Sequence, residues 1–221
     1  MGKILSYFFL ILTLLLVLAY GGYLAVANSV EKPDYAVVVA EDGFEIRDYP
    51  PMIVAEVTTR GDRQSAISAG FRPLAAYIFA SERDGGTIAM TAPVTQDPKA
   101  PEARDKIAMT APVTQTPSGA GEREWTVRFI MPAEYTMETL PRPANAQVRL
   151  VEIPARRRAA VRFSGYPSDE LFEEKEAALR AWLDGRSLTP AGSATYAYYN
   201  DPFTPGFMRR NEVLFDLGDA P

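Results

Sequence analysis

Two stretches of the chain carry methionine, threonine and proline at matched positions. Nine consecutive residues, Ile-Ala-Met-Thr-Ala-Pro-Val-Thr-Gln, occur at 88–96 and again at 107–115. Methionine is flexible and polarisable, so Met90 and Met109 could line a pocket for a flat apolar ligand. The same spacing also predicts two matched strands joined by a long polar loop, each with its methionine facing the core. A local duplication of the chain would explain the identity without any function.

A proline follows the predicted strand in each copy. Pro93 and Pro112 cannot donate a hydrogen bond to a neighbouring strand. We therefore expect each Ile-Ala-Met-Thr strand to end at its proline, or to lie there at an edge of a sheet.

The chain contains no histidine and no cysteine. These absences exclude serine–histidine triads, histidine bases, cysteine nucleophiles, thiolate metal sites and disulfide bonds. The net charge of −5 and the isoelectric point near 5.0 argue against a nucleic-acid partner, which normally requires a basic surface. Any catalysis would depend on carboxylates, tyrosines, lysines, arginines or hydroxyl groups.

Residues 4–27 form an apolar run without a single charge. As a helix this run would span about 36 Å, which suffices for a bilayer core of about 30 Å. Lys3 precedes the run, so the positive-inside rule places the N-terminus in the cytoplasm. We expect residues 1–30 to be a transmembrane anchor in the inner membrane and residues 31–221 to be a periplasmic domain. Ala-Val-Ala at 25–27 leaves a cleaved signal peptide, and hence a secreted or free periplasmic domain, as the alternative.

The periodicity of the remaining chain predicts an α+β domain made of two related halves. In each half, alternating strands precede one helix, and further strands follow it. The predicted helices cover residues 62–80, with Asp62 as N-cap, and residues 168–185, with Ser168 or Asp169 as N-cap and Gly185 just past the end. We expect a curved antiparallel sheet with one helix from each half packed on it.

Several segments resemble the SOUL haem-binding protein family in order and spacing: Gly70–Ala80, both copies of the repeat, residues 125–132, Arg162–Gly165 and Tyr198–Val213. The resemblance covers about residues 35–217. It implies a distorted, β-barrel-like sheet of two pseudo-symmetric halves, each packing one helix. Effector-binding modules of the gyrase-inhibitor-like type share that architecture.

The resemblance also implies non-catalytic binding of haem, a related tetrapyrrole or another amphipathic molecule in an apolar cleft. Without histidine, methionine or tyrosine would have to contact the iron, and arginines would hold the propionates. The expected ligand-binding residues in the family-like segments are Phe71, Arg72, Tyr77, Met90, Met109, Arg209 and Arg210. Of these, Tyr77, Met90 or Met109 would contact the iron. Phe71 and Tyr77 could instead be core residues, and the two C-terminal arginines could anchor the last strand to loop carbonyls.

Two other functions remain open on the same scaffold. One is an enzyme acting on a hydrophobic ester or a tetrapyrrole side chain through a carboxylate such as Glu45, Glu56 or Glu134. The other, from fold analogy alone, is an effector-sensing or protein-interaction module. A cleft with a buried, unpaired carboxylate would favour the enzyme, and an apolar cleft rimmed by arginine would favour the binder.

Overall fold

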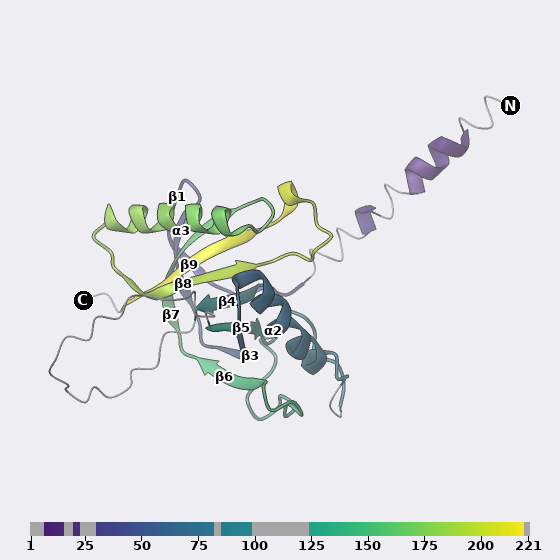
Figure 1. The fold of residues 1–221 in the computed structure, drawn as a ribbon, viewed down its shortest axis with the longest axis horizontal. Coiled ribbons are helices and arrows are strands. Elements are labelled where there is room, and N and C mark those ends of the chain that lie inside the picture. The colour runs from purple at the N-terminus through teal and green to yellow at the C-terminus, as the bar shows by residue number, and fades with distance from the viewer. Residues whose placement is uncertain (1–6, 16–19, 23–29, 82–84, 99–123, 219–221) are drawn as a thin grey trace.

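The computed structural model describes residues 7–15, 20–22, 30–81, 85–98 and 124–218. These residues build a nine-stranded antiparallel sheet on which two long helices pack, as predicted (Figure 1). The strand order is β1-β2-β7-β9-β8-β4-β5-β3-β6, so β1 and β6 form the two edges.

The elements follow one another along the chain in two series. The first series comprises β1 (Ala36–Glu41), β2 (Phe44–Tyr49), β3 (Met52–Arg60), α2 (Arg63–Ile78), β4 (Val94–Pro98) and β5 (Glu124–Ile130). The second comprises β6 (Arg149–Ile153), β7 (Arg156–Phe163), α3 (Asp169–Asp184), β8 (Pro190–Tyr198), the short 3-10 helix η1 (Gly206–Met208) and β9 (Asn211–Leu217).

The sheet consists of two pseudo-symmetric units that interlock. The units are β3-α2-β4-β5 and β7-α3-β8-β9, and in each the sheet order is first strand, third strand, second strand. The second strands, β4 and β8, pair with each other and join the units at the centre of the sheet. The strand before each unit pairs with the other unit, since β2 lies against β7 and β6 lies against β3. Neither half is therefore complete without a strand from the other half.

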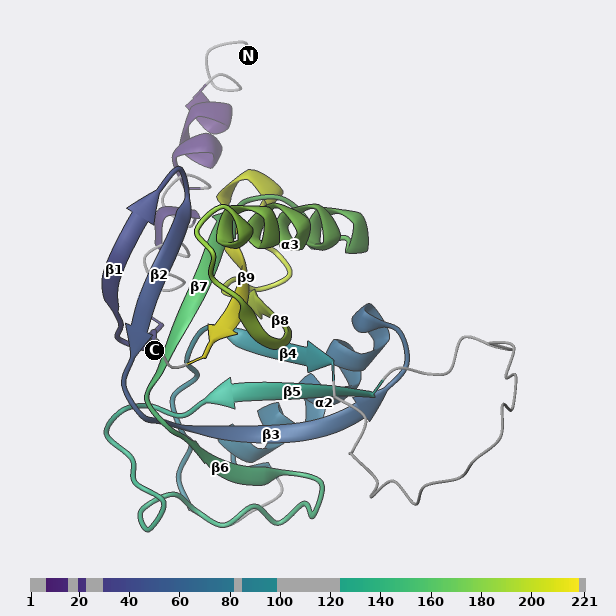
Figure 2. The ribbon, with the colours of Figure 1, turned by 90° about the vertical axis from the view of Figure 1, so that its left-hand side faces the viewer.

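Each helix covers the strands of its own unit, as Figure 2 shows, and it encloses a separate core. Asp62 caps α2 by accepting a hydrogen bond from the Ser65 amide at 2.8 Å, which confirms the predicted N-cap. Gly70 allows close approach to the sheet, because a Cβ there would lie 2.6 Å from Val127 Cγ2. Ser168 caps the start of α3. Gly185 is the C-cap of this helix and has a right-handed backbone conformation, not the left-handed one that is usual for a glycine just past a helix end.

The first repeat copy does not form the predicted strand. Residues 87–90 lie outside the sheet, and β4 begins at Val94, directly after Pro93. This strand lies in the middle of the sheet rather than at an edge. The missing donor of Pro93 is tolerated because the proline precedes the ladder instead of interrupting it. Ile88 is nevertheless buried and Met90 packs against the same core, as expected for that face. The second copy lies outside the described residues.

In the described residues, no helix combines the length and the apolar character that crossing a membrane requires. The anchor predicted over residues 4–27 includes residues 4–6, 16–19 and 23–27, which lie outside the described part.

The structure predicts that the fold needs only one copy of the repeat. Deleting residues 97–115 joins Gln96 to Thr116 and leaves one complete copy. In the deletion variant, Thr116 and Pro117 take the places of Asp97 and Pro98 at the end of β4. The connection from β4 to β5 is thereby shortened from residues 99–123 to residues 118–123.

This deletion should leave the free energy of unfolding within about 1 kcal/mol of the parent value. Two halvings of loop length favour folding by about 1.2 kcal/mol. The deletion also removes the partly buried Asp97–Arg128 ion pair, whose loss offsets part of that gain. Urea unfolding measures the difference. A deletion variant that fails to fold would show that the second copy has a structural role.

Candidate functional site

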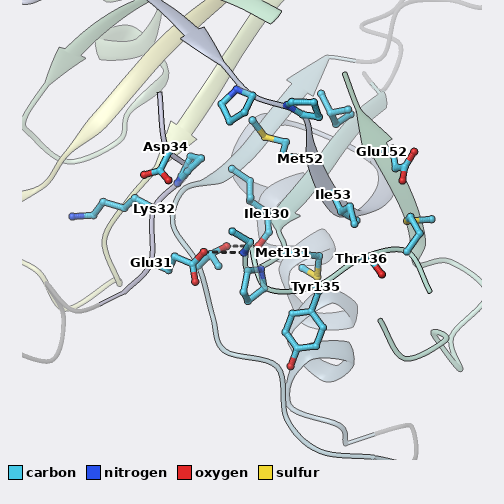
Figure 3. Close-up of a pocket in the computed structure, with 18 of the residues that line it drawn as sticks. Glu31, Lys32, Asp34, Met52, Ile53, Ile130, Met131, Tyr135, Thr136 and Glu152 are labelled. Carbon is cyan, nitrogen blue, oxygen red and sulfur yellow. Dashed lines mark hydrogen bonds between the residues drawn. The ribbon is translucent and has the colours of Figure 1, made fainter. Parts of the chain in front are cut away.

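A pocket of about 550 Å³ lies beside the start of β3 and the end of the edge strand β6 (Figure 3). Its volume is within the usual range for small-molecule sites. Residues 31–34 form one side, and Ile53 and Glu152 lie on the other. The turn between β2 and β3 and the loop after β5 complete the lining. The pocket therefore depends on segments that the pairing of β3 with β5 and β6 brings together.

The inner lining is apolar and adaptable. Three methionines from two distant parts of the chain contribute to it, namely Met52, Met131 and Met137, and Tyr135 lies among them. Five lining residues are prolines: Pro33, Pro50, Pro51, Pro132 and Pro154. Proline fixes φ, so the walls are held in shape before a ligand arrives, while flexible thioethers can adjust to its outline.

The mouth of the pocket is acidic. Glu31, Asp34, Glu138 and Glu152 line it, and Lys32 is the lining residue with a positive charge. The pKa of Glu138 is held below its usual value by hydrogen bonds from Thr136 and from its own backbone, so this carboxylate is ionised at neutral pH. A rim of this sign attracts cations and repels carboxylates.

The wall formed by residues 31–34 is held at Glu31 and at the adjacent Tyr35. At Glu31, the backbone carbonyl accepts from the Ala92 amide at 2.8 Å, and the carboxylate accepts from the Ala133 amide at 2.9 Å. At Tyr35, the hydroxyl accepts from Arg210 at 3.3 Å, and the ring lies 4.4 Å from the Arg47 guanidinium carbon. The pocket wall is thereby connected to a buried cluster of charges behind it.

The centre of that cluster is the ion pair between Arg47 on β2 and Glu212 on β9. The pair is bidentate, with nitrogen–oxygen distances of 2.8 and 3.1 Å, and the side chains are 1% and 0% exposed. Arg210 adds a contact to Glu212 at 2.7 Å, and the Tyr199 hydroxyl donates to the same carboxylate at 2.7 Å. Glu45 contacts Arg47 from the other side at 2.6 Å.

These contacts set the protonation states of the cluster. Burial alone would raise the pKa of Glu212, but hydrogen bonds and charges from Arg47 and Arg210 outweigh it and lower that pKa. Burial raises the pKa of Tyr199 well above its usual value, and the nearby Glu212 charge adds to the effect. Glu212 therefore stays ionised and paired, which suits a structural carboxylate better than a proton-transferring one.

The structure separates the residues predicted to bind a ligand. Phe71 packs edge-to-face on Phe129 with ring centroids 5.2 Å apart. Tyr77 is buried and donates its hydroxyl proton to the Pro141 carbonyl at 2.7 Å, and Met90 packs against the same core cluster. Tyr77 and Met90 therefore belong to the core under α2, whereas Phe71 is 39% exposed and lies outside that cluster. Met109 lies outside the described residues.

The predicted arginines lie in three different environments. Arg72 lines a shallow hollow beside α2 together with Arg60 and Asn145. Arg209 donates to the carbonyls of Thr204 and Pro202 at 2.7 and 2.6 Å, as the strand-anchoring alternative predicted. Arg210 belongs to the buried cluster. The pocket lining includes none of the predicted residues that the structure describes.

The carboxylates proposed for catalysis are also apart. Glu45 is paired with Arg47, and Glu56 is paired with Arg128 and Arg149 at 2.8 and 2.7 Å. Glu134 is exposed in the loop after β5. Within the described ranges, no group of three or more acidic, histidine or cysteine side chains is arranged to hold a metal ion.

The sheet of two interlocked units with one helix each defines the fold as a class of α+β domain. Sequence comparison then identifies the family to which the chain belongs. The chain belongs to the SOUL heme-binding protein family, whose profile matches residues 30–103 and, in a second match, residues 98–216. The first match contains residues 88–96 and the second contains residues 107–115, so each holds one copy of the repeat. Comparison with curated proteins gave no significant match.

Solved structures with the same fold share little sequence with this chain. The EcmrR C-terminal domain superimposes with a TM-score of 0.53 at 14% identity, covering 84% of this chain and 99% of that domain. A hydrolase from Listeria innocua gives 0.51 at 13% identity, covering 82% and 94%. An uncharacterized conserved protein from the same organism gives 0.50 at 14% identity, covering 86% and 94%. At these identities the likeness establishes the fold alone.

Replacing Glu212 by Gln should strongly destabilise the domain. The change leaves Arg47 and Arg210 with a neutral partner in a dry environment, for which a loss of about 3–5 kcal/mol is expected. The matched control is Asp48→Asn, which breaks the exposed Asp48–Arg157 pair and should cost at most about 1 kcal/mol. Urea unfolding of both variants gives the comparison. Equal losses would contradict a central role for the buried pair.

The pH dependence of stability should show a plateau with a fall on each side. No histidine or cysteine titrates near neutrality, so stability should be nearly constant between about pH 6 and 9. Burial raises the pKa of Tyr198 from 10.0 to about 12, so its contribution to stability is complete below pH 10 and is lost between those values. The lowered pKa of Glu212 gives a contribution that is lost as the pH falls below 4.5.

Urea unfolding across a pH series tests this profile. Tyr198→Phe should reduce the alkaline fall without abolishing it, because the pKa values of Tyr49, Tyr196 and Tyr199 are also raised by burial. A stability that changes steeply between pH 6 and 8 would contradict the account.

Proposed function

We propose that the domain binds an amphipathic small molecule in the pocket beside β3 and β6, without catalysis. The observation that carries the proposal is the combination of a proline-fixed, methionine-lined interior with an acidic mouth. The apolar body of the ligand would contact Met52, Met131 and Tyr135. Its polar end, neutral or positively charged, would face the carboxylates at the rim. Burial of a few hundred Å² at about 25 cal/mol per Å² supports micromolar affinity after association costs are subtracted.

The state of the buried carboxylates supports a binding role over a catalytic one. Glu56 and Glu212 are the buried acidic residues among those described, and each is paired with two arginines. A general base near pH 7 normally has a raised pKa and access to substrate. Glu212 has the opposite properties, since its pKa is lowered and its side chain is inaccessible.

Haem fits this pocket only in part. Family membership makes haem a possible ligand, and thioether and phenol groups of the lining could contact its iron. The two propionates of haem call for cationic partners, whereas the described lining residues offer four carboxylates, a single lysine and no arginine. The charge of the rim therefore favours an amphipathic cation over haem, and no step of the proposed function depends on iron.

A pair of isosteric ions tests the proposal directly. Tetraphenylphosphonium and tetraphenylborate have the same shape and opposite charge, so calorimetric titration of both separates apolar fit from charge preference. We expect micromolar binding of the cation and at least about tenfold weaker binding of the anion. Haemin, followed by its Soret band, is the third titrant and should bind less tightly than the cation. Failure of all three to saturate would overturn the proposal.

Charge-neutral variants of the rim supply the second test. Glu138→Gln combined with Glu152→Gln removes two exposed carboxylates from the mouth without touching the core. At about 1 kcal/mol for each nearby charge, cation affinity should fall by about tenfold or more. The control is Glu174→Gln on α3, an exposed residue outside the lining, which should leave affinity unchanged. Equal effects of the variants would mean that the rim does not contact the ligand.

A further inference from the structure

The loop between β8 and β9 displays large apolar side chains to solvent. Phe203 is 86% exposed and Phe207 is 81% exposed. Tyr166 and Met208 are also exposed, and we call these four residues the aromatic loop surface. Residues 30–218 contain eight described large apolar side chains that are exposed, and half of them belong to this surface. Such concentration on a soluble domain usually marks a contact site.

The backbone of this loop is held in a fixed shape. The Asp201 carboxylate accepts hydrogen bonds from the amides of Phe203 and Thr204 at 2.7 and 3.1 Å. Arg209 closes the loop from the other end through the carbonyls of Thr204 and Pro202. Thr204 is buried while its neighbour Phe203 points outward. The hydrogen bonds that hold the loop backbone therefore also keep the phenyl rings exposed.

Tyr166 is attached to the same loop from the other side of the chain. The Gly165 amide donates to the Gly206 carbonyl at 2.9 Å. A Cβ at position 206 would lie 2.9 Å from the Tyr166 ring, so the glycine permits this close packing. The Arg209 guanidinium carbon lies 4.9 Å from the centre of the same ring. Tyr166 therefore packs against the same loop that carries Phe203 and Phe207.

The apolar N-terminal run reaches this surface. The Tyr20 hydroxyl donates to Met208 Sδ at 3.1 Å. Figures 1 and 2 both show helical residues 7–15 and 20–22 leading away from the domain on the side where η1 lies. Residues 4–27 carry no charge, and their membrane span stays a prediction. A membrane that held residues 4–27 would therefore also lie close to Met208 and its neighbour Phe207.

We propose that the aromatic loop surface rests in the interface of a lipid bilayer. Aromatic and apolar side chains are favoured at the boundary between headgroups and acyl chains, where Phe203 and Phe207 would insert. The Asp201 carboxylate is turned toward the backbone of the loop and does not oppose insertion. The contact with the uncharged N-terminal run favours lipid over a second copy of the chain as the occupant. The contact between the aromatic loop surface and the bilayer would fix the orientation of the domain on the membrane. It does not depend on what the pocket binds.

The absence of cysteine makes a site-specific test straightforward. Phe203→Cys and Phe207→Cys are made separately in the full chain and labelled with an environment-sensitive fluorophore. The labelled proteins are reconstituted into phosphatidylcholine vesicles, with and without doxyl-labelled lipid as a quencher. The matched control is Phe79→Cys, because Phe79 is an exposed phenylalanine just after α2. Circular dichroism confirms that each labelled variant is folded.

We expect labels at positions 203 and 207 to be quenched by the doxyl lipid at least about twofold more strongly than the label at position 79. Their emission should also shift to the blue on reconstitution. Equal quenching at the three positions would overturn the proposal. A blue shift that increases with protein concentration and is insensitive to doxyl lipid would also overturn it, in favour of a second copy as the occupant.

Discussion

The buried ion pair between Arg47 and Glu212 is the contact on which the rest of the structure depends. It connects β2, which precedes the first unit of the sheet, to β9, which ends the second unit. Removing two charges from water costs several kcal/mol per ion, and only the bidentate geometry with the further contacts of Arg210 and Tyr199 offsets that cost. Because Arg47 and Arg210 also contact Tyr35, the same cluster holds the segment that forms one wall of the pocket.

The interlocking of the two units explains why the pocket lies at the β3–β6 edge. β6 belongs to the second series of elements but pairs with β3 of the first, so residues about a hundred positions apart in the chain become neighbours. Met52 at the start of β3 and Met131 after β5 both line the pocket because β3 also pairs with β5. A ligand there would contact elements of both series, and the chemistry of the lining decides which ligand binds.

Sequence predicted the local elements well, because local chemistry specifies them. The helical period together with Asp62 and Ser168 as caps located both long helices, and alternation located most strands. The position of β4 was wrong, since a proline is compatible with either the end or the beginning of a strand and only pairing with β5 and β8 decides. The pocket was missed for a related reason. Glu31, Met52 and Met131 share no spacing pattern, and only strand pairing together with the hydrogen bonds of Glu31 to Ala92 and Ala133 brings them to one pocket.

The central claim is that the ligand occupies the pocket beside β3 and β6. Amide hydrogen exchange measured with and without saturating tetraphenylphosphonium tests it most directly, because it reports location as well as binding. The account predicts slower exchange in residues 31–35, 52–53, 131–138 and 152–153, with α3 unchanged. Protection confined to the hollow beside Arg72, or to the aromatic loop surface, would contradict it.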